Sequence, residues 1–161
     1  MSPERAIFNT HFLACAQRIS KLKASLAKSQ AWLPVDIDTL ARLTETQEES
    51  IDALILRYNQ CVSLIQDQIF RGIAIIEQED IRDKTNRDKA LLMEKIGVIT
   101  SADAFGSAAL LRNKFSHHYP EDAQDQVDKI NLVYSETQHV LQIFEHIRAF
   151  VFARGYIPQA D

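Results

Sequence analysis

The feature that most constrains the fold is a long stretch in which apolar side chains recur at every third or fourth position. It runs from about Thr46 to Gln78, with Ile51, Leu54, Ile55, Tyr58, Val62, Ile65, Ile69, Ile73 and Ile76 along one broad side. At ~1.5 Å per residue, such a helix would be roughly 50 Å long and would need partners along most of its length. Gly72 lies within it, where a small residue permits either a bend or a close backbone approach.

Helical periodicity continues through most of the chain. Further helices are expected over residues 2 to about 28, about 86 to 96, from 101 into the segment before Pro120, and 121 to about 154, with one helical turn from Asp38. Strand-like alternation persists nowhere, and only 4 Gly and 4 Pro are present to break helices. The sequence predicts one all-α domain over residues 1–161, a mostly antiparallel bundle of four main helices plus one or two short helices.

Two aspects of the composition narrow the class of protein. The sequence lacks both an apolar run of membrane-spanning length and the order typical of a signal peptide, so a cytoplasmic protein without a membrane partner is expected. Cys15 and Cys61 lie in helical patterns without metal-ligand spacing, which predicts buried reduced thiols, no metal site and no cofactor.

The net charge of −4 argues against a protein that coats nucleic acid through a broad basic surface. It leaves room for a local cationic cleft. One stretch, from Leu111 to Pro120, has the composition for such a cleft, since it holds Arg112, Asn113, Lys114, His117, His118 and Tyr119. The proline disfavours the helical conformation in the residue before it, so these polar groups are expected at a helix end.

The helix that leads into this stretch carries two stripes. Ala104, Ala108, Leu111 and Phe115 form an apolar stripe that is expected to face the core. Gly106, Leu110, Asn113 and His117 form a second stripe, on which Gly106 would admit another helix and Leu110 is apolar on a face expected to be wet. This second stripe predicts another packing surface, of the kind that a homodimer interface would use.

The side chains of the stretch suit phosphodiester chemistry. Imidazole exchanges protons near neutral pH, and a guanidinium binds phosphate oxygens through paired donors. Asn113 and His117 share a helix face. Arg112 and His117 point ~140° apart in an ideal helix. They converge only if the helix distorts, if the long arginine side chain reaches round the helix, or if two subunits share the site. The alternative is a solvated helix end, where the helix dipole favours cations.

The motif resembles a known signature. Arg112-Asn113-x-x-x-His117-x-Tyr119 fits the Arg-x4-His-x-Tyr pattern of HepT-like proteins, members of the HEPN family of small helical domains. Leu111 before the motif and the long final helix after it are also similar to that family. The bundle pattern covers most of the chain, but only the eight-residue motif is specific.

The resemblance implies a toxin of a toxin–antitoxin pair that acts as a metal-independent endoribonuclease. Two motifs would face each other across a homodimer cleft, with Arg112 and His117 catalytic and Asn113 orienting the histidine or the RNA. Lys114 and His118 would help to bind this substrate. The resemblance also implies a nucleotidyltransferase-type antitoxin that modifies Tyr119 with AMP.

Two positions depart from the family pattern. Ser116 stands where many relatives have a small apolar residue, and His118 adds a second imidazole that could share the proton transfer. Some similar proteins are described as non-catalytic companions of nucleotidyltransferases. A nucleotide- or partner-binding subunit is therefore the alternative function.

Overall fold

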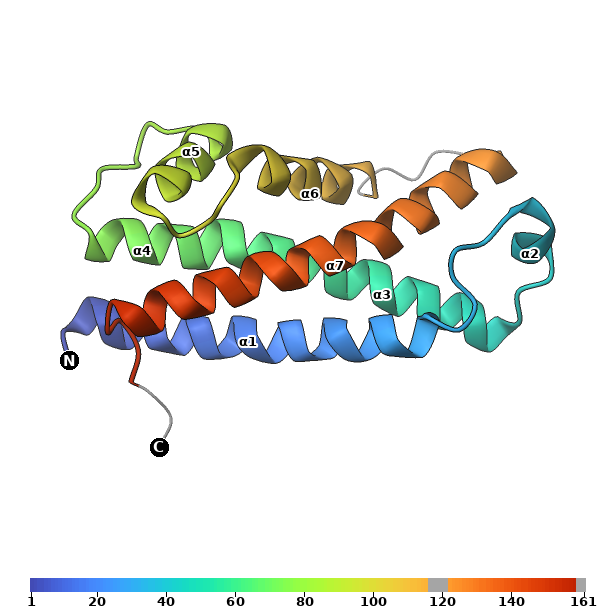
Figure 1. Cartoon of the computed structure of the whole chain (residues 1–161), viewed down its shortest axis with the longest axis horizontal. Helices are drawn as coiled ribbons and strands as arrows, with labels where there is room; N and C mark the ends of the chain where they lie inside the picture. The colour runs from blue at the N-terminus through green and yellow to red at the C-terminus, as the bar shows by residue number, and fades with distance from the viewer. Residues whose placement is uncertain (116–121, 159–161) are drawn as a thin grey trace.

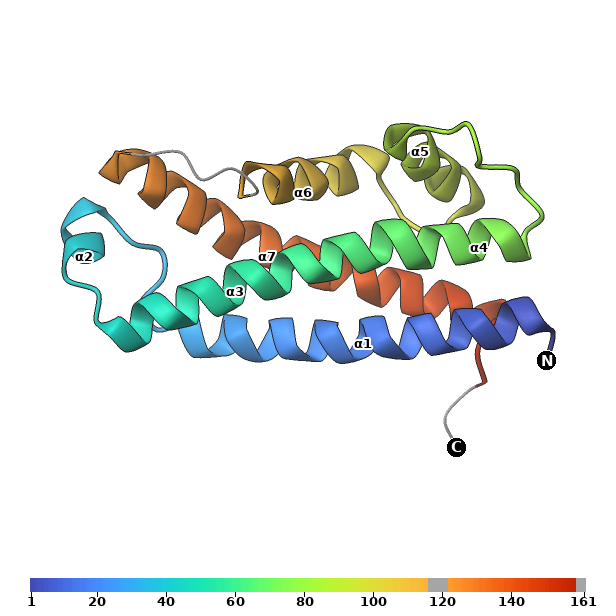
Figure 2. The same cartoon turned by 180° about the vertical axis from the view of Figure 1, so that it is seen from behind.

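The computed structural model describes residues 1–115 and 122–158. Its three longest helical segments are α1 (Pro3–Ser29), a continuous path formed by α3 (Glu45–Leu64), η1 (Ile65–Ile69) and α4 (Phe70–Ile76), and α7 (Ala123–Ala153). They lie side by side, with the shorter α6 (Ala102–Lys114) and α5 (Asn86–Ile96) above them and α2 (Ile37–Ala41) at one end (Figures 1 and 2). The described residues contain no strand, so the predicted all-α class is confirmed.

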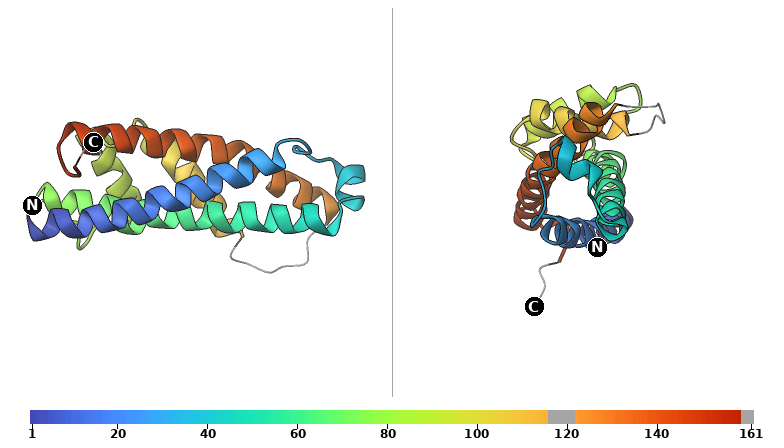
Figure 3. Two further views of the ribbon diagram at one scale, coloured as in Figure 1. Left: turned by 90° about the horizontal axis from the view of Figure 1, so that it is seen from below. Right: turned by 90° about the vertical axis from the view of Figure 1, so that its right-hand side faces the viewer.

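The bundle alternates in direction. α1 and α6 run one way, and the α3–α4 path and α7 run the other way (Figure 1). The view along the long axis shows α1, the α3–α4 path and α7 surrounding the core, with α5 and α6 as a further layer (Figure 3). The predicted antiparallel bundle of four main helices and two short ones describes this arrangement. Within the described part of the chain, no helix has the length and hydropathy needed to span a membrane.

Local sequence signals set the helix ends. The side chains of Ser2, Thr44, Thr85, Ser101 and Asp122 each accept a hydrogen bond from a backbone N–H of the helix that follows. Such side chains satisfy donors that the first helical turn leaves unpaired. The predicted helix over residues 86–96 has those bounds, and it ends because Gly97 adopts a left-handed conformation, with φ of 98°.

The long central helix contains a wider turn that its periodicity did not predict. At η1 the N–H of Phe70 donates to the carbonyl of Ile65, five residues earlier, which is a π-helical bond. Around it, buried residues repeat every four positions, in the rows Cys61, Ile65, Ile69, Ile73 and Val62, Gln66, Phe70, Ala74. In a regular α-helix such rows rotate by ~40° per step, and the extra residue in the π-turn compensates for this rotation.

Gly72 allows a close approach between helices. A Cβ at this position would lie 2.6 Å from Cδ2 of Phe8 in α1, so the absence of a side chain lets the ring contact α4. Of the two roles open to Gly72, the structure therefore supports the close approach, and the irregular turn is at η1.

The core joins every layer of the bundle. Phe8, Phe12 and Phe144 are almost fully buried, and the rings of Phe12 and Phe144 stack with centroids 5.4 Å apart. The predicted burial of Cys15 and Cys61 is confirmed, and both are free thiols. Burial raises the pKa of each thiol to about 12, because a buried thiolate would lose its hydration.

One predicted core position in α6 is wrong. Ala104 is exposed, and the buried residues of this helix are Ala102, Phe105, Ala108 and Leu111. The buried face moves around the helix because α6 packs against α5 as well as against α3 and α7. Near the start of α6, Phe105 supplies the core contact instead, with its ring 4.8 Å from that of Phe70.

The two helical glycines give a direct test of the packing at α4. We expect Gly72→Ala to lower the free energy of unfolding by ~1–3 kcal/mol, because the new methyl group overlaps the buried ring of Phe8. Gly106→Ala is the matched control, since its Cβ would meet only the Nη1 atom of Arg87, at 3.8 Å. The free energy of unfolding of this control should rise by ~0.5–1 kcal/mol, because alanine favours the helix more than glycine does. Urea unfolding followed by circular dichroism measures both, and equal effects would contradict the close approach.

Candidate functional site

The candidate site lies at the carboxyl end of α6, where the structure describes Arg112, Asn113 and Lys114. The other predicted site residues, His117, His118 and Tyr119, are outside the described residues. Their roles, and the convergence of His117 with Arg112, therefore stay predictions.

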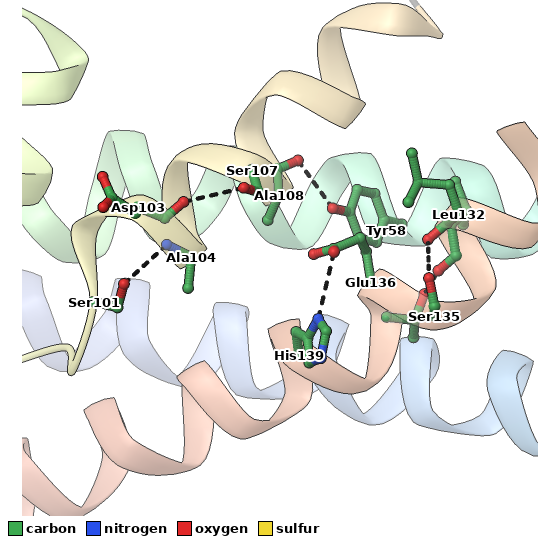
Figure 4. Close-up of polar contacts among 12 residues, drawn as sticks. Tyr58, Ser101, Asp103, Ala104, Ser107, Ala108, Leu132, Ser135, Glu136 and His139 are labelled. Atoms are coloured by element: carbon green, nitrogen blue, oxygen red, sulfur yellow. Dashed lines mark hydrogen bonds and ion pairs between the residues drawn. The ribbon is translucent and has the colours of Figure 1, made fainter.

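A buried tyrosine fixes α6 on the long central helix. Tyr58 of α3 is fully buried, and its hydroxyl donates to the carbonyl oxygen of Ala108 at 2.9 Å (Figure 4). Burial raises the pKa of Tyr58, the negative charge of Glu136 raises it further, and the positive charge of Arg112 opposes the shift. The phenol therefore stays protonated and keeps donating to α6 at ordinary pH.

Arg112 is held by the same pair of helices. Its Nη1 donates to the hydroxyl oxygen of Ser63 at 3.1 Å, and its Nη2 lies 3.5 Å from Oδ1 of Asn113. The neighbouring Leu111 is buried and anchors the last turn of α6 in the core. A guanidinium has five N–H donors, so these two contacts leave donors available for an anion such as phosphate.

The last turn of α6 is cationic. Arg112 is half-buried, whereas Lys114 is exposed. Both cations are favoured there by the helix dipole, as in the solvated-end interpretation. The contact of Arg112 with Ser63 distinguishes it from a freely solvated side chain, because it fixes the guanidinium against α3.

A groove of about 320 Å³ opens beside Arg112, between α5, α6 and the π-turn. We call it the α5–α6 groove, and the polar residues that line it are Gln66, Asn86, Arg87, Arg112 and Asn113. The sequence did not predict that Ser63 contacts Arg112, or that Gln66, Asn86 and Arg87 line the same groove as Arg112. The sequence does contain an indication for Gln66. It is the one polar residue in the row Val62, Gln66, Phe70 and Ala74, which is otherwise apolar.

The remaining histidines, His11, His139 and His146, lie on α1 and α7. His139 Nδ1 lies 3.4 Å from a carboxylate oxygen of Glu136 on the same helix (Figure 4). His146 Nε2 lies 3.1 Å from the carbonyl oxygen of Gly97, so it links α7 to the end of α5. His11 borders a separate groove between α1 and α4. Among the described residues, no group of three or more His, Cys, Asp or Glu side chains could hold a metal ion.

Comparisons with protein-family models, with curated proteins and with solved structures found no significant match for this chain.

The contact between Tyr58 and α6 can be tested by removing one hydroxyl. We expect Tyr58→Phe to lower the free energy of unfolding by ~1 kcal/mol, because a buried hydrogen bond is lost. Tyr156→Phe is the matched control, since the buried hydroxyl of Tyr156 has no hydrogen-bond partner among the described residues. Loss of the Tyr156 hydroxyl should leave the free energy of unfolding unchanged or raise it. Parallel urea unfolding of both variants measures the difference, and a neutral Tyr58→Phe would argue against the anchor.

Proposed function

We propose that this protein is a HepT-like toxin, a metal-independent endoribonuclease with a composite Arg-x4-His site in a homodimer cleft. The observation that supports the proposal most is the placement of Arg112. Ser63 holds its guanidinium at the end of α6, directly before the segment that carries His117. The all-α bundle is also compatible with the family that the motif resembles.

The proposed reaction is attack by a ribose 2′-hydroxyl on the adjacent phosphorus. One imidazole, that of His117, takes the hydroxyl proton as the new P–O bond forms, and the bond to the 5′ oxygen breaks as that oxygen gains a proton. The proton donor is His117 of the partner subunit or the neighbouring His118. The products are a 2′,3′-cyclic phosphate and a 5′-hydroxyl.

Arg112 would stabilise the negative charge that develops on the phosphorane oxygens. A guanidinium fixed before the reaction needs little reorganisation in the transition state, which is why positioning by Ser63 favours this role. Asn113 would orient His117 or the substrate, and Lys114 and His118 would contact neighbouring phosphates. Modification of Tyr119 with AMP by a nucleotidyltransferase antitoxin would add negative charge beside the cleft, and so repel RNA.

The catalytic assignment predicts that Arg112→Ala and His117→Ala each reduce RNA cleavage at least ~100-fold, because each removes a charge-stabilising or proton-transfer group. His11→Ala is the matched control, since His11 lies on α1, away from the motif. Cleavage of a fluorescent RNA measures the rates, and circular dichroism verifies folding. Cleavage by the double variant at the wild-type rate would disprove the site.

The same assay separates the two candidate functions. A 2′-deoxy substitution at the scission site removes the nucleophile, so cleavage should stop there. For a non-catalytic nucleotide-binding subunit, the substitution should matter little.

The proposed dimer has its own test. Leu110 is 61% exposed on α6, on the stripe that also carries Gly106 and Asn113. The motif begins two residues later, at Arg112 in the last turn of α6. We expect Leu110→Glu to weaken dimerisation at least tenfold, because a carboxylate would lose its hydration in an apolar contact. Leu13→Glu is the matched control, with Leu13 59% exposed on α1. Analytical ultracentrifugation over a concentration series measures both, and an unchanged dimer in Leu110→Glu would exclude this interface.

A further inference from the structure

The α5–α6 groove combines features that suit one nucleotide. At about 320 Å³ it lies in the size range of small-ligand sites, ~300–1,000 Å³. Phe105 and Ala109 supply apolar surface on one side, and three amide side chains, Gln66, Asn86 and Asn113, also line the groove. Apolar surface can cover the face of a base, and amides can pair with its donor and acceptor edges.

Gln66 is the most constrained of these amides. It belongs to the π-turn η1, and only 5% of the residue is exposed although its side chain is polar. Its Nε2 lies 3.5 Å from Oδ1 of Asp67, at the outer limit of a hydrogen bond. A buried amide held this weakly is well suited to hydrogen-bond a ligand in the groove that it borders.

The groove also has an anion-binding end. Asn86 and Arg87 are the first two residues of α5, so their N–H groups lie at the positive end of the helix dipole. Arg87 is positioned by Asp103, which accepts from its Nη2 at 2.6 Å. Its Nη1 faces Gly106 of α6, only 3.8 Å from the place where a Cβ would stand. Arg112 also lines this groove, so both of its arginines contribute positive charge to it.

We propose that the α5–α6 groove binds one nucleotide of the RNA strand, next to the phosphate that is cut. Its base packs on the apolar lining at Phe105 and Ala109 and pairs with Gln66, and its phosphate binds at Arg87 and the start of α5. This inference rests on the proposed ribonuclease function and extends it with a subsite that sets the position of the strand relative to Arg112.

The test measures binding without cleavage. The probe is a fluorescein-labelled 2′-O-methyl RNA hexanucleotide, which lacks the free 2′-hydroxyl and cannot be cut by the proposed reaction. Fluorescence anisotropy gives its dissociation constant for the full chain. We expect Arg87→Ala to weaken binding about tenfold, and the matched Arg82→Ala to leave it unchanged. Arg82 is also exposed and paired with an aspartate, Asp80 at 2.8 Å, but it lies outside the groove.

A size series at Gly106 tests the volume of the groove independently of charge. Space beside Gly106 is open apart from Arg87, so larger side chains should enter the groove without disturbing the core. We expect the affinity for the hexanucleotide to fall about twofold in Gly106→Ala and at least tenfold in Gly106→Leu. The circular dichroism spectrum should be unchanged in both variants. Wild-type binding to the hexanucleotide that does not respond to Arg87→Ala or Gly106→Leu would overturn the subsite, as would an absence of binding by the wild type.

Failure of the subsite is distinguishable from failure of the ribonuclease. His117→Ala should bind the hexanucleotide as tightly as the wild type does. Its rate of RNA cleavage should fall at least ~100-fold. If His117→Ala still cleaves at the wild-type rate but Arg87→Ala loses binding, the proposed catalytic site is wrong and the subsite stands. If His117→Ala loses cleavage but Arg87→Ala and Gly106→Leu bind normally, the ribonuclease stands and the subsite is wrong.

Discussion

The structure depends on how α6 is fixed to the long central helix. Tyr58 reaches from the core to the carbonyl oxygen of Ala108, and Arg112 reaches back to Ser63, so two polar contacts join the same pair of helices. Apolar packing alone is tolerant of small rotations, whereas hydrogen bonds of defined length and direction are not. The end of α6, where Arg112 lies, therefore has a set orientation.

The π-turn has a consequence for the same region. It keeps two rows of side chains buried, each with a spacing of four residues along the helix. One of these rows includes Gln66. In a regular α-helix two four-residue steps would place Val62 and Phe70 ~80° apart, and the π-turn reduces this spread, so Gln66 lies in one narrow buried row with both. π-turns are frequent at functional sites. Here the turn borders the groove that also contains Arg112.

The sequence predicted what local signals determine. Apolar spacing predicted the all-α class and the approximate extent of the helices, because it depends on residues within a few positions of each other. It did not predict the exposure of Ala104, the π-turn or the contact of Ser63 with Arg112. Each of these depends on which helix lies opposite, and periodicity within one helix carries no such information. The second helix stripe placed Leu110 on a wet face correctly, with 61% of the residue exposed.

The acidic balance of the chain does not oppose RNA binding at this place. At physiological ionic strength, charges separated by more than about 8 Å are largely screened, so a phosphate in the groove responds mainly to its immediate neighbours. Those neighbours include Arg87, Arg112 and the positive end of α5, and they are opposed by carboxylates. Asp103 contacts Arg87, Glu94 contacts the N–H of Ala102, and Asp67 contacts Gln66. Pairing two copies of the chain would bring a second such set of cations to a shared cleft while adding the overall negative charge at longer range. The net charge of −4 also leaves the chain without the broad basic surface that extended, non-specific coating by nucleic acid would need.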